Sequence, residues 1–383
     1  MSQNKNRRRE NPQSVTSTAA TVAEKIPLVS VVMPMFNAAK FVSQTLESLL
    51  YQTMTNFEVV IVDDCSTDNS IEVVESFRER FGGRLKLVKL PKNTGTPGLP
   101  RNVGIQLARG KYIAFLDCDD LYTKTALEEL STLAEKFQAD VVHTDGTFNL
   151  WGNKPKAEDD SEMTDMDALL NRSNPIIWRP PAAPVLKEPT FEPQNFQTRL
   201  DLWLKFGYRW AVSSSFVKRD FLAANQICFA DILGAEDMLF NFNILCVAEK
   251  ILRVPNVTYI IRPRAGSISR EKQSVDVSQH LHKWLSVMVD GTKIFEEIMS
   301  RVNFFAERPD YRYAVIDFFF QDALHEVPRI YAQIPAFKLN ELVKPEFHPD
   351  DASLAAYLFN TVNVYRLQIM KLQHELAALK QQS

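Results

Sequence analysis

Cysteine, histidine and long apolar runs are all scarce in this chain of 383 residues. The four cysteines, Cys65, Cys118, Cys228 and Cys246, lie far apart and give neither a Cys-x-x-Cys pair nor a disulfide framework. Two of them stand in apolar runs, and the N-terminus lacks the pattern of a signal peptide, so we expect reduced thiols and a cytoplasmic protein. The six histidines show no metal-ligand spacing and no catalytic Ser-His-Asp or Cys-His pattern.

No uninterrupted apolar run approaches the roughly 18 residues that a membrane-spanning helix needs. We therefore expect a soluble protein, with at most peripheral association at the inner face of a membrane. The net charge of −3 excludes the basic surface of a nucleic-acid-binding protein. Any anionic ligand must then be held by a local site.

The N-terminal residues 1–26 are rich in Ser, Thr, Asn and Arg, which predicts a disordered tail. Contact of Arg7, Arg8 and Arg9 with an anionic membrane surface is the alternative to a solvated tail.

From Pro27 onward, apolar runs alternate with segments of helical period. The runs lie at 28–33, 57–62, 85–90, 112–116 and 140–144, and the helical segments at 38–52, 69–81, 99–109 and 123–137. This alternation predicts an α/β domain over residues 27–272, with a mainly parallel sheet and flanking helices. Ligands of such sheets bind beyond the carboxyl ends of the strands, where the acidic residues of this sequence fall.

Residues 150–210 interrupt the alternation with a proline-rich stretch that excludes a long helix or a central strand. Trp178, Arg179, Trp203 and Trp210 favour an ordered loop, and we expect an insertion on the acceptor side of the site.

The C-terminal part is helical over 273–350, with segments near 278–302 and 309–325, and ends in an amphipathic helix over 351–383. Apolar residues of this last helix follow the alternating spacing of four and three that is typical of a coiled coil: Leu358, Val362, Tyr365, Ile369, Leu372, Leu376 and Leu379. Glu375 and Lys380 fall at flanking positions suited to ion pairs. We expect a homo-oligomer, and docking of the helix on its own chain is the alternative.

The first acidic cluster, Asp63-Asp64-Cys65-Ser66-Thr67-Asp68, follows the second strand. Ser66, Thr67 and Asp68 are predicted to cap the next helix. Asp63 and Asp64 exceed what a cap needs, so one of them is expected to bind ligand.

The second acidic cluster, Asp117-Cys118-Asp119-Asp120, follows the fourth strand. Carboxylates packed so closely repel each other unless a cation joins them. Two alternate carboxylates with diphosphate oxygens suit Mg²⁺ or Mn²⁺. The alternative is a cap formed by Asp119 or Asp120 before the helix at 123–137.

With these segments in order, the chain resembles glycosyltransferase family 2, which has the Rossmann-like GT-A fold. The likeness rests on VVMPMFNAAKFVSQTLESLLYQT, EVVIVDDCSTDNS, KNTGTPGLPRNVGIQLARGKYIAFLDCDD and GAEDMLFNFNIL. It implies a metal-dependent, inverting transferase that uses a nucleotide-sugar donor. Cys65 stands where the family usually has glycine, which puts the local backbone conformation in doubt.

The resemblance also implies roles on the donor side. Pro34 and Asn37 line the nucleotide pocket, Asp64 meets the base, and Arg101 and Asn102 lie over the nucleoside. Asp117 corresponds to the ribose contact and, with Asp119, to the metal ligands.

The segment Gly234-Ala235-Glu236-Asp237 carries the acceptor side. By the resemblance Asp237 is the catalytic base, with Glu236 beside it. Such a base is required, because an acceptor hydroxyl loses its proton as it attacks the anomeric carbon. The alternative is an N-cap for the following helix.

The segment 259–270 resembles the part of the family that folds over the donor diphosphate. An arginine with nearby hydroxyls suits phosphate oxygens, and Arg262 and Ser267 are the candidates. A generic basic loop is the alternative.

The sequence therefore favours transfer of a sugar, most simply from a UDP-sugar, to a hydroxyl of a glycan or glycolipid acceptor in bacterial surface polysaccharide synthesis. The expectation of a surface glycan, whether capsule, lipopolysaccharide or teichoic acid, rests only on what members of the family commonly do. A nucleotidyltransferase is an alternative, but it usually has a glycine-rich loop after the first strand, where this chain reads MPMFNAAKF. A non-catalytic oligomeric scaffold is the other alternative.

Overall fold

The computed structural model describes residues 26–149, 176–178, 185–206, 211–232, 234–262 and 277–323, and six separate residues between 362 and 375. The predicted tail, most of the insertion, Ser267 and most of the predicted coiled coil lie outside the described residues.

The N-terminal half alternates strands and helices, as the sequence predicts. The elements are β1 (Val29–Met35), α1 (Val42–Leu50), β2 (Phe57–Asp63), α2 (Ser70–Ser76), β3 (Leu85–Lys89), α3 (Gly98–Leu107) and β4 (Tyr112–Phe115). The strands β1 to β4 pair in parallel. Every residue of β1, β2 and β4 is buried, which explains their continuous apolar runs, because helices cover such a sheet on both faces.

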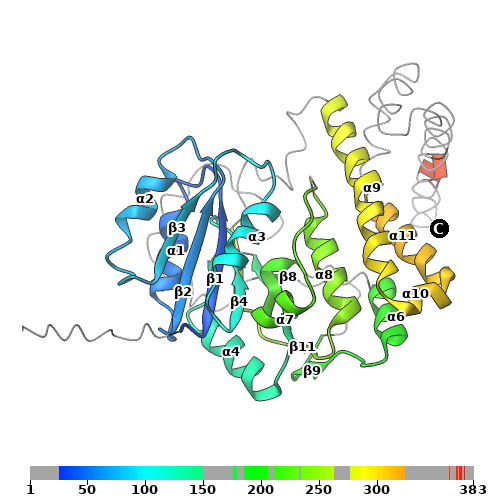
Figure 1. Ribbon diagram of the computed structural model, residues 1–383, viewed down its shortest axis with the longest axis horizontal. Helices are drawn as coiled ribbons and strands as arrows, with labels where there is room; N and C mark the ends of the chain where they lie inside the picture. The colour runs from blue at the N-terminus through cyan, green and yellow to red at the C-terminus, as the bar shows by residue number, and fades with distance from the viewer. Residues whose placement is uncertain are drawn as a thin grey trace, which may run out of the picture.

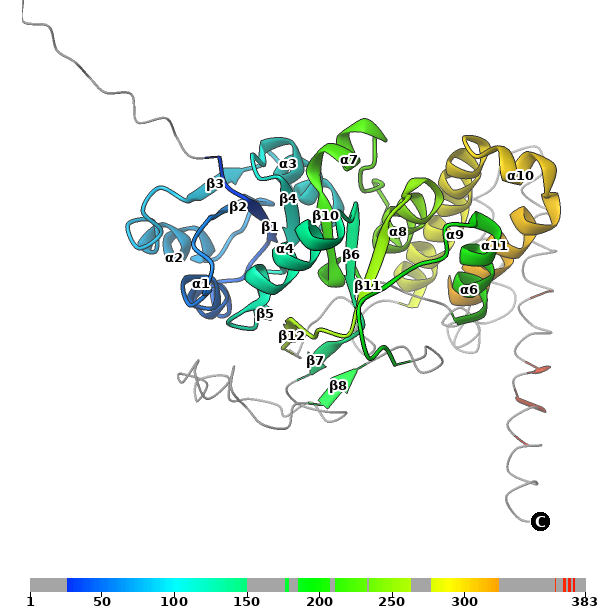
Figure 2. The ribbon, with the colours of Figure 1, turned by 90° about the horizontal axis from the view of Figure 1, so that it is seen from below.

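The second half adds shorter strands and further helices. They are β5 (Leu121–Tyr122), α4 (Ala126–Phe137), β6 (Val141–Thr144), β7 (Thr147–Asn149), β8 (Ile176–Trp178), β9 (Thr190–Phe191), α6 (Phe196–Phe206), the 3₁₀ turn η2 (Val212–Ser214), β10 (Ser215–Lys218), α7 (Arg219–Ala224), α8 (Glu236–Val247), β11 (Ile251–Val254) and β12 (Tyr259–Ile261). The described strands form a large sheet in the order β3-β2-β1-β4-β10-β6-β11-β9 and a small one in the order β5-β12-β7-β8. β10 is antiparallel to both of its neighbours, and the small sheet lies beside the large one (Figure 2).

Helices cover both faces of the large sheet and enclose two apolar cores. One core packs α1, α2 and α4 against β1 and β2. The other contains α6, α7 and α8, and the C-terminal helices α9 (Val277–Ser300), α10 (Asn303–Glu307) and α11 (Pro309–Ala323) join it (Figure 1). Phe242 of α8 contacts Trp203, Phe295 and Phe305, with ring centroids 4.9–6.3 Å apart. The C-terminal helices therefore support the back of α8.

The loops after β1 and β2 satisfy each other, which corrects part of the predicted capping. The residue at the N-cap of α2 makes no side-chain cap bond. Ser66 Oγ accepts from Asn37 N (2.9 Å), and Thr67 N donates to Asn37 Oδ1 (2.8 Å). Only Asp68 bonds the start of α2, where its Oδ1 accepts from Ser70 N (3.0 Å). Both loops leave the same edge of the sheet, so their polar groups meet before they reach the helix.

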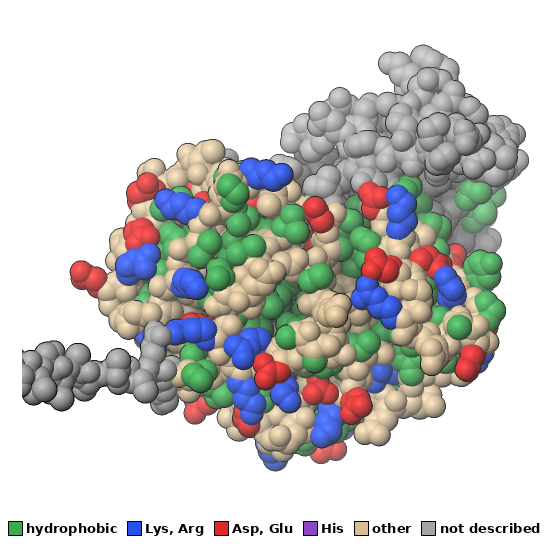
Figure 3. Space-filling view, in the orientation of Figure 1, with side chains coloured by type: hydrophobic (Ala, Val, Ile, Leu, Met, Phe, Trp, Pro, Cys, Tyr) green, Lys and Arg blue, Asp and Glu red, His purple; other side chains and the backbone are tan. Residues whose placement is uncertain are grey.

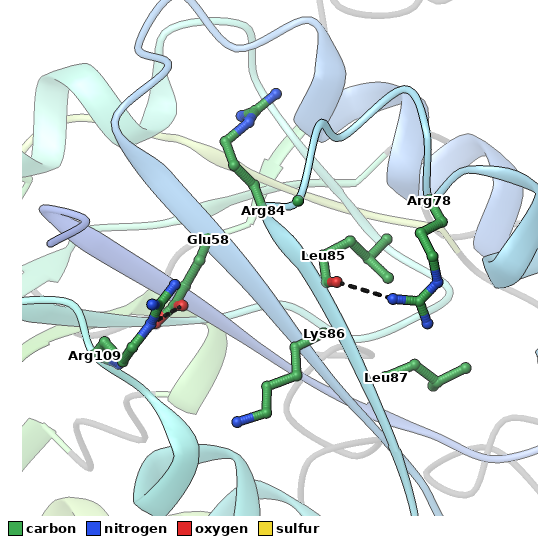
Figure 4. Close-up of a pocket in the computed structure, with 8 residues that line it drawn as sticks. Glu58, Arg78, Arg84, Leu85, Lys86, Leu87 and Arg109 are labelled. Carbon is green, nitrogen blue, oxygen red and sulfur yellow. Dashed lines mark hydrogen bonds and ion pairs between the residues drawn. The ribbon is translucent and has the colours of Figure 1, made fainter. Parts of the chain in front are cut away.

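A hollow of about 340 Å³ lies along the edge strand β3 (Figure 4). Two of its cations have protein partners: Arg109 Nε donates to Glu58 Oε2 (2.9 Å), and Arg78 Nη1 donates to Leu85 O (3.5 Å). Glu58 and Leu85 stand at the amino ends of β2 and β3, away from the carboxyl edge. Charges around an edge strand discourage pairing with another chain, which accounts for this cluster.

Lysine and arginine side chains are interspersed with acidic ones over the face in Figure 3. Within the described ranges, no helix has the length and apolar character to cross a membrane. Val362, Ile369 and Leu372 of the predicted seam are helical, and their exposed fractions are 52%, 53% and 64%.

Candidate active site

Both acidic clusters lie at the carboxyl edge of the large sheet. Met35, the last residue of β1, is paired with Asp63, and Asp64 N donates to Met35 O (2.8 Å). On the other side of β1, Leu116 N donates to Val32 O (3.1 Å), which places Asp117 directly beyond this edge. The strand order explains the meeting, because β1 lies between β2 and β4.

Arg101 of α3 joins the second acidic cluster to the start of α8. Its Nη2 lies 2.8 Å from Asp117 Oδ1, and its Nη1 lies 3.0 Å from Asp237 Oδ1. Glu236 Oε1 is 4.0 Å from the same Nη1. The Arg101 side chain is only 6% exposed. One buried guanidinium thus brings together the predicted leaving-group side and the predicted base.

Three carboxylates around one guanidinium leave the site with excess negative charge. Burial, followed by the charge of Asp237, raises the pKa of Glu236 to about 7. Burial also raises the pKa of Asp237, and Arg101 opposes this rise. For Arg101 itself, burial disfavours the charged form, but Asp117 and Asp237 outweigh it and raise its pKa. The arrangement favours binding of a cation or transfer of a proton.

A left-handed turn presents Glu236 and Asp237 at the N-terminus of α8. Gly234 and Ala235 have φ angles of 116° and 59°. Helix α8 begins at Glu236, so Asp237 belongs to its first turn and is not the N-cap. The Asp237 side chain is 37% exposed, in contrast to Arg101 beneath it. The carboxylate of Asp237 is therefore accessible to solvent.

The turn from Asp117 to Asp120 is fixed from behind by the small sheet. Tyr259 of β12 accepts from Asp117 N at its hydroxyl (3.2 Å) and donates the same hydroxyl to Asp120 Oδ2 (2.9 Å). Arg262 N donates to Asp120 Oδ1 (2.8 Å). Sequence reasoning assigned no role to Tyr259, and only the pairing of β12 with β5, which follows the turn, identifies it.

The guanidinium of Arg262 bonds protein acceptors, and its contact with phosphate stays a prediction. Its Nε donates to the backbone oxygen of Asp119, its Nη1 bonds Gln44, and its Nη2 donates to Phe41 O (3.2 Å) and Thr45 Oγ1 (2.9 Å). These acceptors belong to the acidic turn and to the start of α1. The guanidinium predicted to meet phosphate therefore fastens the turn to α1, because these protein acceptors surround it.

Residues predicted on the nucleotide side lie near the ends of β1 and β2. Pro34 is a buried residue of β1, and Asn37 follows the strand with a φ of 48°. Asp64 is buried and accepts from Thr94 N (2.9 Å) and Thr94 Oγ1 (3.0 Å). Asp64 therefore orders the loop before α3 as well as the edge of the sheet.

Asn102 does not face this edge with its amide. Its Nδ2 donates to Phe229 O (2.9 Å), and Phe229 N donates to its Oδ1 (2.8 Å). The structure thus places Asn102 against the loop before α8.

Cys65 has the backbone conformation that glycine would supply. Its φ is 63°, in the left-handed region, and its Sγ lies 3.1 Å from Leu90 O. The departure from the family pattern at this position leaves the turn in a conformation that side chains rarely adopt.

The acidic turn fits a divalent cation by its chemistry. Among the residues that the structure covers, no three His, Cys, Asp or Glu side chains are grouped to hold a metal ion. A hydrated Mg²⁺ needs only one or two protein carboxylates, with phosphate oxygens completing its shell. Burial, followed by the charges of Asp119 and Asp117, raises the pKa of Asp120 well above its ordinary value. A cation at the turn would relieve that repulsion. Neither Asp119 nor Asp120 caps the next helix, which has Thr125 at its N-cap.

Comparisons with known proteins identify a common family. The model of glycosyl transferase family 2 matches residues 30–185. An uncharacterized glycosyltransferase of Haemophilus influenzae is 30% identical over 246 residues, which cover 62% of this chain and 94% of the relative. The uncharacterized glycosyltransferase EpsJ of Bacillus subtilis is 29% identical over 258 residues, 67% of each chain.

Some longer relatives match this chain over only a small part of their own length. The poly(ribitol-phosphate) beta-N-acetylglucosaminyltransferase TarS of Staphylococcus aureus is 39% identical over 115 residues, which are 30% of this chain and 20% of TarS. A crystal structure of S. aureus TarS 1–349 has a TM-score of 0.60 at 20% identity and covers 90% of this chain and 91% of that one. This likeness shows the fold.

Proposed function

Because the chain belongs to glycosyltransferase family 2 and has its GT-A fold, we propose that it transfers a sugar from a UDP-sugar to a hydroxyl of a bacterial surface glycan, with inversion at the anomeric carbon. The observation that carries this proposal is the Arg101 bridge between Asp117 and Asp237. Through this bridge, the proposed leaving-group site and the proposed base contact the same guanidinium group. The family match favours this transferase over a nucleotidyltransferase or a non-catalytic scaffold.

The donor is proposed from the relatives. S. aureus TarS has been crystallised with UDP and with UDP-GlcNAc, at TM-scores of 0.51 and 0.53 to this chain. The sequence match between this chain and TarS covers only 20% of TarS. UDP-GlcNAc and UDP-glucose are the first donors to test, since poly(ribitol-phosphate) glucosyl- and N-acetylglucosaminyltransferases are both among the relatives.

Asp237 is proposed as the base on the acceptor side. Its carboxylate reaches solvent, while Arg101 holds one of its oxygens and favours the ionised form. A displacement in one step needs such a base opposite the leaving group. Glu236 lies beside it, more deeply buried, and takes part through the shared charge of the cluster.

Asp117 and Asp119 would hold Mg²⁺ or Mn²⁺ together with the donor diphosphate. The cation would stabilise the charge that develops on the departing UDP. Tyr259 and Arg262 keep the turn in place, so the two carboxylates need little rearrangement to bind.

The acceptor and the assembly remain proposals from the sequence. The insertion over 150–210 is proposed to bind the glycan or glycolipid acceptor. The exposed seam residues Val362, Ile369 and Leu372 support self-association through the C-terminal helix. For such an acceptor, we propose that the enzyme is cytoplasmic and works at the inner face of the membrane.

The proposal is tested by release of the nucleoside diphosphate (UDP, GDP or TDP) from a panel of UDP-, GDP- and TDP-sugars with Mn²⁺, water serving as the acceptor. We expect release from a UDP-sugar, and Asp237→Asn should lower its rate about 10²- to 10⁴-fold, the usual contribution of a general base. Binding of UDP should stay near that of the parent chain. Asp220→Asn, an exposed carboxylate on α7, is the control and should behave as the parent. Unchanged release by Asp237→Asn, or lost UDP binding, would contradict the role of Asp237 as base.

A further inference from the structure

The loop that leads to the proposed base is bonded to α3 by a single side-chain amide. Asn102 Nδ2 donates to Phe229 O (2.9 Å), and Asn102 Oδ1 accepts from Phe229 N (2.8 Å). Both ends of the amide thus serve one residue of the segment 226–232, the described part of the loop before α8. This reciprocal pair of hydrogen bonds fixes the position of the loop along α3 and its orientation, as a pair of backbone hydrogen bonds would.

Phe229 transmits this anchor to the elements that carry the chemistry. Its ring stacks on Phe240 of α8, with centroids 4.1 Å apart and planes inclined by 3°. It also meets Phe115, at the end of β4, edge to face at 5.6 Å. The guanidinium of Arg101 lies 5.4 Å from the centre of the same ring. A shift of Phe229 would therefore move α8 relative to β4.

Gly98, at the start of α3, allows the loop to come this close. A Cβ atom at this position would lie 3.1 Å from Phe229 Cβ, 3.3 Å from Ala230 O and 3.4 Å from Glu236 Cγ. The first two contacts are tighter than ordinary packing, and one of them is to backbone. The distance between α3 and the loop is therefore set at two successive turns of the helix, by Gly98 and by Asn102.

We propose that Asn102 is a positioning residue that holds Asp237 at a fixed distance from the Asp117 turn by anchoring the segment 226–232 to α3. This inference rests on the proposed role of Asp237 as the base. Arg101, the residue before Asn102, bonds both Asp117 and Asp237, so one turn of α3 determines where the two carboxylates stand. Displacement of a reacting group by about 1 Å lowers a rate steeply, which gives a remote anchor a measurable effect.

Asn102→Ala removes both bonds to Phe229 and tests the proposal. The assay is UDP release from the UDP-sugar that the parent chain hydrolyses fastest, with Mn²⁺ and with water as the acceptor. We expect kcat to fall about 100-fold, as a displaced reacting group predicts, while the KM for the donor and the Kd for UDP by calorimetry stay unchanged. Gln138→Ala is the matched control: its Nε2 donates to Glu135 O (2.6 Å) at the end of α4, so its loss weakens a helix without moving the loop. Its kcat should equal that of the parent.

Gly98→Ala reaches the same loop from a second position and should lower kcat in the same selective way. Parent-like kcat in both variants would overturn the proposal. Weaker UDP binding by Asn102→Ala would also overturn it, since it would assign Asn102 to the nucleotide pocket. If thermal melting shows that Asn102→Ala does not fold, Asn102→Ser, which keeps one hydrogen-bonding group, and Gly98→Ala decide by the same criteria. Asp237→Asn in the same assay separates the two proposals: full activity there rejects the base, whereas a large loss there with no loss in the loop variants rejects only the anchor.

Discussion

Glu236 is expected to make the folded chain less stable as the pH rises. Its pKa in the folded protein is about 7, raised from an ordinary value of 4.5 first by burial and then by Asp237. Between these two values the folded state holds a proton that the unfolded state has lost. The free energy of unfolding therefore decreases as the pH rises from about 4.5 to about 7, because stability falls with pH wherever the folded state binds more protons. Glu236→Gln removes this titration.

The size of the effect follows from the same two values. The shift from 4.5 to about 7 corresponds to at most roughly 3.4 kcal/mol, at about 1.36 kcal/mol for each pKa unit. Asp237 shares part of the proton, and the Glu236 side chain is 12% exposed, so we expect about 1–3 kcal/mol. This amount is a large fraction of the stability of an ordinary domain.

The measurement is urea unfolding of the parent and of Glu236→Gln at pH 5 and pH 8. The variant should gain stability relative to the parent by about 1–3 kcal/mol on going from the lower to the higher pH. Glu79→Gln, an exposed carboxylate in the segment after α2, should show the pH dependence of the parent. A variant that differs from the parent by the same amount at both values of pH would refute the reasoning, because Glu236 would then not titrate between them.

Three further predictions concern the turn, the backbone and the assembly. Tyr259→Phe leaves Asp117 N and Asp120 Oδ2 without their hydroxyl partner, so unfolding in urea should show a loss of about 2–4 kcal/mol, at about 1–3 kcal/mol for each buried group left unsatisfied; the exposed Tyr313→Phe should change nothing. Cys65→Gly should keep or raise the free energy of unfolding by up to about 1 kcal/mol, since glycine adopts the left-handed φ without strain, whereas Cys65→Val should lose about 1–2 kcal/mol; equal losses in both would show that the side chain matters more than the backbone. Truncation after about residue 355 should lower the oligomeric state, measured by light scattering as the number of chains in each particle, and an unchanged number would mean that the terminal helix docks on its own chain.

The sheet and its functional edge are predictable because their signals are local. The sequence runs that form β1, β2 and β4 are largely apolar without alternation. Such runs are typical of parallel strands that helices cover on both faces. Alternation with helices then places the residues after each strand at one edge, so Asp64 and Asp117 are found there without knowledge of their contacts. The antiparallel strand β10 between β4 and β6 carries no such signal, since its position depends on pairing with segments far away in the sequence.

Individual side-chain partners are harder to predict, because residue type and motif do not determine direction. Asn102 follows Arg101 in the sequence, yet one amide turns to the loop at Phe229 while the guanidinium faces three carboxylates. A helix makes this separation natural, since neighbouring positions point about 100° apart around its axis. The resemblance predicts that both residues lie over one ligand, whereas their protein contacts lie on different sides of α3.

Arg101 and Arg262 show what this difference in surroundings implies for binding. Both are buried and both contact the acidic turn, but Arg262 holds it from behind through backbone and α1 acceptors. Arg101 meets only carboxylates there, and two of them, Asp117 and Asp237, are exposed by 36% and 37%. If the turn holds a cation and a diphosphate as proposed, we expect them to replace the Arg101 contacts at the open side while the bonds from Tyr259 and Arg262 stay in place. The turn would then bind its ligand as a rigid element, and the rearrangement on binding would be confined to the guanidinium that also contacts the proposed base.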